Sequence, residues 1–272
     1  AIEAALRLNA VDVAQNIAAL QWGRLLAVDA ARVIALARPE QRATPDMADE
    51  MKSASSLISF FATQLTAYQN ESYAAEFTAV IRPFMNWLEK AGLDADHFGC
   101  KAARALYRAM AIKDEYEVAR LLTSSKAHQN ITDMAGANAK ITYHLAPPFL
   151  SWIRDKDGHP RKLKFGGWLT PILRGLGKMR YLRGRWYDPF GYGHAKQQEQ
   201  RHKGAVMAWL QQLKDIPQTC PPSQLDKVLD LMLSIRGYGH VKEQNYQNAC
   251  PQIEACLEAM RMPPHNVDTA AE

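Results

Sequence analysis

The sequence predicts a mainly α fold, a multi-helix domain with a small β-ribbon insertion. Long stretches of the chain repeat apolar residues every three or four positions, the spacing that places them on one face of a helix. Two short stretches, 140–145 and 161–165, instead alternate apolar and polar residues and are rich in residues that favour strands. The chain has 272 residues, of which 47% are hydrophobic, so it can bury a sizeable core.

The N-terminal third predicts helices on both sides of a linker. Residues 2–36 favour helix with a break at 9–12, where Asp12 can cap a second helix. The mixed-charge stretch 38–47 contains two prolines and is the best linker candidate. From Met47 to Tyr68 the apolar residues alternate steps of four and three, which indicates a packed helix. We expect a second helix to follow it and Pro83 to kink or interrupt that helix.

The stretch 102–122 contains neither Gly nor Pro and predicts one continuous central helix. Lys113, Glu117 and Arg120 fall within its apolar arc, with the carboxylate one turn from each cation. We interpret these three residues as a structural charge network that is substantially buried, because charges in an apolar face need partners. A catalytic lysine or glutamate is the alternative interpretation.

The second half of the chain gives a less regular pattern. Residues 124–139 are polar and show no clear period, and residues 166–192 are rich in glycine and aromatic residues. Three more helices are expected at about 195–214, directly after Pro221–Ser223, and at about 241–260.

Several classes of protein have no support in the sequence. The four cysteines, at positions 100, 220, 250 and 256, form no C-x-x-C pair, so we expect reduced thiols in a cytoplasmic protein. Neither a dinucleotide fingerprint nor a P-loop is present, and no motif indicates a metal site or a catalytic residue. No apolar run approaches the roughly 18 residues of a membrane span.

Positive charge is concentrated in one segment. The chain carries 33 Lys and Arg against 28 Asp and Glu, and residues 154–185 alone hold ten of these cations against two Asp. Such a basic segment indicates an acidic partner. The residues that we single out as candidates for binding such a partner are Arg161, Lys162, Lys164, Arg183 and Arg185.

Polar residues in the expected loops form a second set of candidates, which consists of His144, Asp188, Arg236, His240 and Lys242. Loop residues of these types can bind ligands, but they also build structural polar networks. The stretch 183–194 interleaves arginine with aromatic residues, and such side chains can stack on nucleic-acid bases. A packed Arg–Tyr–Asp cluster at a domain boundary is the interpretation we favour, and nucleic acid, an anionic ligand or an acidic protein remain alternatives.

Several segments together resemble one family, the C-terminal region of the fused indolepyruvate:ferredoxin oxidoreductase-like proteins. Their order along the chain resembles the family's order. The segments are Leu65–Ala75, Ala111–Arg120, His144–Pro148, Asp157–Lys162, Arg183–Gly184, Asp188–Tyr192 and Arg236–Lys242. Residues 1–9 and 16–24 also resemble the end of that family's γ-type domain, whereas Ala10 and Ile112 depart from the family's usual residues.

The resemblance implies three parts: residues 1–38 as the end of a preceding γ-type domain, 39–262 as a C-terminal helical accessory domain, and 263–272 as a disordered tail. The chain would then be a fragment of an enzyme that oxidatively decarboxylates a 2-oxoacid to an acyl-CoA and passes the electrons to ferredoxin.

Thiamine diphosphate, Mg and 4Fe-4S clusters are expected in the other domains of that parent enzyme, and no cofactor is expected in this chain. Its expected partners are the other domains, ferredoxin, and further copies in a homo-oligomer, without a membrane and without nucleic acid. The rival hypothesis is a stand-alone basic adaptor domain that binds nucleic acid or an acidic protein.

Overall fold

The computed structural model describes residues 2–9, 13–37, 51, 53–136, 140–146, 161–217 and 220–261. The chain divides into two compact units, residues 1–50 and residues 51–272. The linker predicted at 38–47, the domain boundary predicted between residues 38 and 39 and the tail predicted at 263–272 lie outside the described residues.

The first unit contains α1 (Ile2–Asn9), α2 (Val13–Val28) and α3 (Ala30–Ala37). The prediction of a single break between two helices is incomplete, because a second break falls at Asp29. The Asp29 carboxylate accepts a hydrogen bond of 2.9 Å from the backbone N–H of Arg32, which caps the start of α3. The cap predicted at Asp12 lies outside the described residues.

The second unit is mainly helical with a small two-stranded sheet, and this confirms the predicted fold class. Its helices are α5 (Ala54–Tyr68), α6 (Glu71–Lys90), α7 (Ala95–Met110), α8 (Glu115–Leu122), α9 (Ser125–Ala135), α10 (Thr170–Lys178), α11 (His194–Leu213), α12 (Pro222–Ser234) and α13 (His240–Arg261). Short 3-10 turns, η2 (Gly167–Leu169) and η3 (Met179–Leu182), flank α10.

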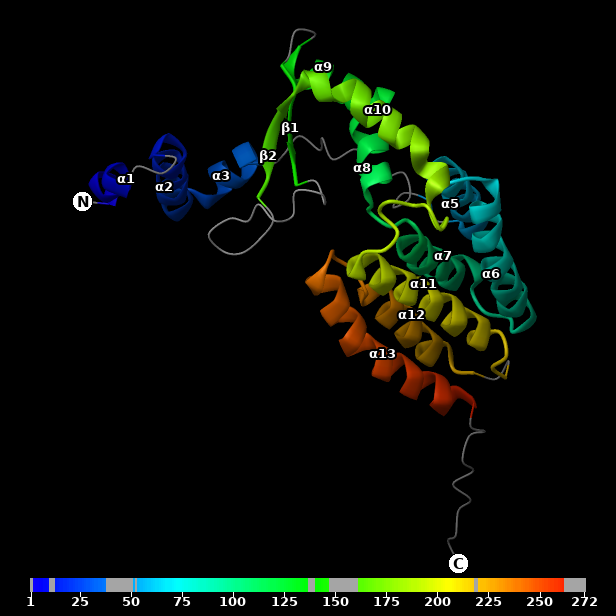
Figure 1. The fold of residues 1–272 in the computed structure, drawn as a ribbon. Coiled ribbons are helices and arrows are strands. Elements are labelled where there is room, and N and C mark those ends of the chain that lie inside the picture. Colours follow the sequence, from blue (N-terminus) through cyan, green and yellow to red (C-terminus); the bar gives the residue numbers. More distant parts are fainter. Residues whose placement is uncertain are drawn as a thin grey trace, which may run out of the picture. The chain divides into compact units, whose positions relative to one another are not determined.

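Helix α7 lies at the centre of a bundle formed with α5, α6, α11, α12 and α13 (Figure 1). It begins at Asp94, whose carboxylate caps the backbone N–H of His97 at 2.9 Å. Its buried face is built largely of glycine and alanine, so neighbouring helices approach closely on several sides. On its rim, Lys101 bridges Asp226 and Asp230 of α12, each at 2.7 Å. We call these six helices the helical bundle.

A smaller layer packs around α8 and α10, which lie against one another. Strands β1 (Thr142–Leu145) and β2 (Leu163–Gly166) form an antiparallel pair in which Tyr143 faces Phe165. Ala119, Tyr143 and Leu173 are the buried centre of its apolar cluster. We call α8, α10 and this β-hairpin the satellite layer.

The central helix predicted at 102–122 is wrong as one continuous element. Helix α7 ends at Met110, and Ala111 has φ −82° and ψ 74°, which is outside the helical region. Helix α8 starts afresh at Glu115, because the Asp114 side chain accepts from the backbone N–H of Glu117 at 2.9 Å and caps the new helix. Lys113 therefore lies in the connection rather than on a helix.

Two stretches for which no element was predicted contain helices. The polar stretch 124–139 contains α9, which Ser124 caps and which has no buried residue, so no apolar period reveals it. The glycine-rich stretch 166–192 contains α10, with Pro171 in its first turn. Pro83 does not interrupt α6, which buries apolar residues on both sides of it. Within the described residues no helix combines the length and apolarity that crossing a bilayer requires.

Gly177 allows the close contact between α10 and α8. A Cβ atom at this position would stand 3.1 Å from both the Cα and the backbone nitrogen of Arg120, whereas a Cβ at Gly175 would meet nothing within 4 Å. Gly177 and Gly175 thus lie in the same helix, but only Gly177 faces the backbone of α8.

We predict that Gly177→Ala lowers the free energy of unfolding by about 1 kcal/mol, because backbone atoms of α8 must move to admit the methyl group. Gly175→Ala, the matched control, should raise it by about 0.5–1 kcal/mol through helix propensity alone. Urea unfolding of both variants measures the difference. Equal effects of the two substitutions would show that α8 and α10 do not approach as closely as described.

Candidate functional site

An ion pair between Asp114 and Arg183 lies in the interior of the second unit. The guanidinium Nε donates to one carboxylate oxygen at 2.6 Å and Nη2 donates to the other at 2.7 Å, a bidentate arrangement. The exposed fractions of the two side chains are 4% for Asp114 and 3% for Arg183. The remaining guanidinium nitrogen, Nη1, donates to the backbone carbonyl of Tyr68 in the helical bundle.

Further groups complete the environment of this pair. The guanidinium carbon stands 3.7 Å from the ring centroid of Tyr68, in a cation–π arrangement. Lys196 of α11 donates to the Asp114 carboxylate at 3.0 Å. The buried Asp188 accepts from the Tyr116 hydroxyl at 2.9 Å and from the backbone N–H of Phe190 at 3.0 Å.

The groups that form this set are Tyr68, Asp114, Tyr116, Arg183, Asp188 and Lys196, which we call the Asp114 network. Its electrostatics favour charged Asp114 and neutral tyrosines. Burial alone would raise the pKa of the Asp114 carboxyl, but the hydrogen bonds and charge of Arg183, together with the charge of Lys196, lower that pKa below its usual value. Burial and the nearby Asp114 carboxylate raise the pKa of the Tyr68 hydroxyl. Burial and the hydrogen bond to Asp188 raise the pKa of the Tyr116 hydroxyl.

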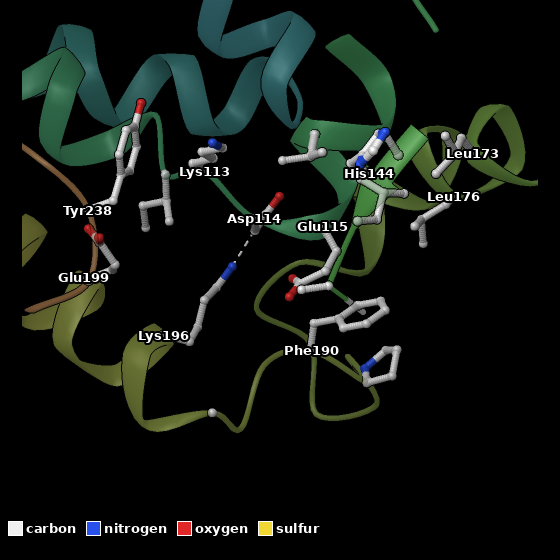
Figure 2. A pocket seen from close by; sticks show the side chains of 18 of the residues that line it. Lys113, Asp114, Glu115, His144, Leu173, Leu176, Phe190, Lys196, Glu199 and Tyr238 are labelled. Carbon is white, nitrogen blue, oxygen red and sulfur yellow. Dashed lines mark hydrogen bonds and ion pairs between the residues drawn. The ribbon is translucent and has the colours of Figure 1, made fainter. Parts of the chain in front are cut away.

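A cavity of about 880 Å³ opens beside the Asp114 network, between the satellite layer and α11. Figure 2 shows Lys113, Lys196, Glu199 and Tyr238 on one side and the apolar Leu173 and Leu176 on the other. The other apolar lining residues include Val118, Leu145, Phe165, Leu169, Ile172 and Phe190. The site thus joins an apolar chamber to a polar end, as small-molecule sites commonly do.

A second polar cluster ties α11 to α13 at the edge of the cavity. Lys242 pairs with Glu199, and His202 Nε2 lies 3.0 Å from a Glu243 oxygen. His202 is only 2% exposed, and its Nδ1 has no hydrogen-bond partner among the described residues. Burial lowers the pKa of the imidazole, while its bond to Glu243 acts in the opposite direction. The net result is that the pKa of the His202 imidazole lies below its usual value.

The expected charge network of Lys113, Glu117 and Arg120 is present only in part. Glu117 and Arg120 form a two-point ion pair at 2.6 and 2.8 Å, with exposed side-chain fractions of 14% and 24%. Lys113 does not belong to this network, because α7 ends at Met110 and Lys113 lies in the connection before α8. Its ammonium instead stands 4.8 Å from the ring centroid of Tyr238.

The residues proposed to bind an acidic partner divide into two groups. Arg161 and Lys162, directly before β2, and Lys164 within it are exposed, and so is Arg185. Arg183 is not available to a partner, because it is buried in the Asp114 network. Nothing in the sequence around Arg183 and Arg185 indicates that the first is buried and the second exposed.

The polar loop residues also have different roles. His144 is exposed and lines the cavity, whereas Asp188 is buried in the Asp114 network. Lys242 lies within α13 rather than in a loop and is buried against Glu199. Arg236 and His240 are exposed and do not line the cavity. The Arg–Tyr–Asp cluster favoured for the stretch 183–194 is present only in part. Arg183 and Asp188 are buried in the Asp114 network inside the second unit, but the tyrosines that contact them are Tyr68 and Tyr116, whereas Tyr187 and Tyr192 of the stretch are exposed.

Sequence reasoning assigned no site role to the groups around which the site is built. These are Tyr68, Asp114, Glu115, Tyr116, Lys196, Glu199 and His202. One signal for Asp114 exists in the sequence. Asp114 and Glu117 form an Asp-x-x-Glu pattern, which is typical of a helix start and argues against a helix running through it. The other residues carry no local signal, because their partners are distant in sequence.

Nothing in the described part of the chain resembles a metal centre, since no group of three or more His, Cys, Asp or Glu side chains converges there. The arrangement holds charged groups fixed beside an apolar chamber. Such an arrangement can bind a small molecule selectively, with the fixed charges contacting its polar end and the chamber holding its apolar body.

The fold and the site thus define a helical domain with a buried ion-pair network and an adjacent amphiphilic cavity. A protein-family model matches residues 54–255, from the first residue of α5 into α13. The chain belongs to this family, a family of unknown function designated DUF6537. No curated protein and no solved structure matches the chain significantly.

We predict that Arg183→Met lowers the free energy of unfolding by about 3–5 kcal/mol, because it leaves the buried Asp114 carboxylate with Lys196 as its remaining cationic partner. The matched control is Arg185→Met, the same change at an exposed position, which should alter stability by no more than about 0.5 kcal/mol. Denaturant unfolding followed by circular dichroism measures both. Similar stabilities for the two variants would be incompatible with a buried Asp114–Arg183 pair.

Proposed function

We propose that this chain is the C-terminal accessory part of a thiamine- and iron–sulfur-dependent 2-oxoacid:ferredoxin oxidoreductase of the indolepyruvate type, and that it is non-catalytic on its own. The cofactors, thiamine diphosphate with Mg and 4Fe-4S clusters, would be held by the other domains of a cytoplasmic, homo-oligomeric enzyme. The chain's role would be to bind and to position rather than to react.

One observation carries the proposal: the separate segments that carry the resemblance meet in space. Tyr68 comes from the first segment, Asp114 from the second and Arg183 from a third, and all three join one buried network. His144 and Tyr238, from two other segments, line the cavity beside it. Chance likeness of composition gives no reason for such segments to converge, whereas a shared structural site does.

A stand-alone basic adaptor for nucleic acid or an acidic protein is the second candidate function. Exposed cations and large aromatic side chains favour it, since Trp168 is 64% exposed and Trp186 is 82% exposed in the basic part of the chain. Such side chains can stack on unpaired bases. The two functions differ in what precedes Ala1 in the native polypeptide.

The test is to purify the native polypeptide that contains this chain. We expect a protein that binds thiamine diphosphate and iron and reduces ferredoxin with an aryl 2-oxoacid and coenzyme A. The 272-residue chain produced by itself should bind neither thiamine diphosphate nor iron. A native protein without those cofactors that co-purifies with nucleic acid would refute the oxidoreductase assignment and favour the adaptor.

The exposed cations of the hairpin yield a further prediction about ferredoxin. Replacing Lys162 and Lys164 by Glu in the full enzyme should slow the association of an acidic ferredoxin severalfold and flatten its dependence on ionic strength. Replacing the exposed Lys214 and Lys227 of the bundle by Glu is the matched control with the same charge change. Stopped-flow reduction across ionic strengths measures the rates.

Two results would exclude steering by the hairpin. One is an equal loss of rate in both double variants, which would reflect net charge alone. The other is a loss of activity toward a small artificial electron acceptor as well, which would indicate that the hairpin lysines pack against neighbouring domains.

A further inference from the structure

The cavity beside the Asp114 network has the size and the walls of a small-molecule site. Its volume of about 880 Å³ falls within the range of roughly 300–1,000 Å³ that is common for such sites. Side chains from α8, α10 and the hairpin supply the apolar walls, including Val118, Leu145, Phe165 and Leu176. Phe190 closes one side from the loop that follows Asp188. The chamber therefore fits an apolar body of about the size of an aromatic ring or larger.

The polar end of the cavity has more cationic groups than its carboxylates can balance. Arg183 and Lys196 share the single Asp114 carboxylate. Lys196 donates one N–H to this carboxylate, and an ammonium group has three N–H donors. Two donors therefore have no partner among the described residues and can reach a ligand. Glu199 adds no free negative charge, because it pairs with the buried Lys242.

Lys113 adds a second available cation at the mouth. It is exposed and lies over the Tyr238 ring, and no carboxylate of the described residues stands within 4.0 Å of its ammonium group. Lys113 and Lys196 both line the cavity, from the loop before α8 and from α11. Two cations from different elements thus border the same space.

Glu115 is the one lining carboxyl group that no ion pair neutralises among the described residues. It is half-buried at the first position of α8, and burial raises its pKa. An anionic ligand would meet repulsion from Glu115 and attraction from Lys113 and Lys196. The balance favours a ligand with one negative charge over a neutral or a cationic ligand.

We propose that this cavity is a binding site for a small monocarboxylate with an apolar, ring-sized body. The carboxylate lies between Lys113 and Lys196, and the body occupies the chamber lined by Val118, Phe165 and Leu176. The inference does not depend on the oxidoreductase proposal, because every residue it uses belongs to this chain.

Three probes that differ only in their polar end test the ligand class. Isothermal titration calorimetry of the 272-residue chain at neutral pH compares hydrocinnamate with the corresponding alcohol, hydrocinnamyl alcohol, and the corresponding amine, phenylpropylamine. We expect saturable binding of one hydrocinnamate per chain, about tenfold tighter than the alcohol, and the weakest binding for the amine. Equal binding of acid and alcohol, tighter binding of the amine, or no saturable binding of hydrocinnamate at millimolar concentration overturns the proposal.

Charge variants of opposite sign locate the carboxylate. Lys113→Gln should weaken hydrocinnamate binding by about five- to tenfold, and Glu115→Gln should strengthen it by about threefold. Lys178→Gln is the matched control, because Lys178 is exposed on α10 and does not line the cavity. Equal weakening by the Lys113 and Lys178 substitutions, or weakening by Glu115→Gln, overturns the proposed position.

A cavity-filling variant locates the apolar body. Leu176→Trp should abolish hydrocinnamate binding, whereas Leu121→Trp should not, because Leu121 is 50% exposed and lies outside the cavity. Thermal melts establish whether each variant is folded. If Leu176→Trp does not fold, the Lys113→Gln and Glu115→Gln variants test the site instead. Full binding to a folded Leu176→Trp protein overturns the proposed site.

Discussion

The bidentate ion pair between Asp114 and Arg183 is the interaction on which the arrangement of the second unit depends. It joins residues 69 positions apart, and the same guanidinium reaches the Tyr68 carbonyl 115 positions away. Such a buried pair is tolerated only when its remaining donors and acceptors are satisfied. Here the backbone N–H of Glu117, the ammonium of Lys196 and the face of Tyr68 complete the set.

The same carboxylate also determines local structure. By capping α8, Asp114 fixes where the central helical stretch breaks and in which direction the satellite layer begins. Arg183 lies directly after η3, the short turn that follows α10. The ion pair therefore joins the start of α8 to the segment after α10, and Arg183 links both to Tyr68 of the helical bundle. Asp114 also lines the cavity.

The sequence predicted those elements that bury one continuous face. The bundle helices α11, α12 and α13 and the β-hairpin fall in this class, because burial on one side forces a period. Helix α9 buries no residue and so has no period to detect. Helix α10 lies in a glycine-rich stretch that shows no helical period. It packs on α8 through the close approach of Gly177 to Arg120, and only the three-dimensional structure reveals this contact.

The site was less predictable than the fold, because contacts between residues distant in sequence decide which side chains belong to it. Arg183 and Arg185 are alike in sequence, and only the presence of Asp114 opposite one of them makes it an interior residue. Lys113 was placed on a helix because the apolar period continues across the break at Ala111. The cavity draws its lining from residues 112 to 239, so no short window of sequence contains it.

The cavity lies at the boundary between two layers of unequal size, and this has a consequence for its stability. Among the described residues the buried centre of the satellite layer consists of Ala119, Tyr143 and Leu173, whereas the bundle has a far larger interior. Partial opening of α8 and α10 should therefore need less free energy than global unfolding. Because the walls come from both layers, opening destroys the cavity. Its occupancy and the docking of the satellite layer form one linked equilibrium, in which any molecule bound there slows amide hydrogen exchange in α8 and α10.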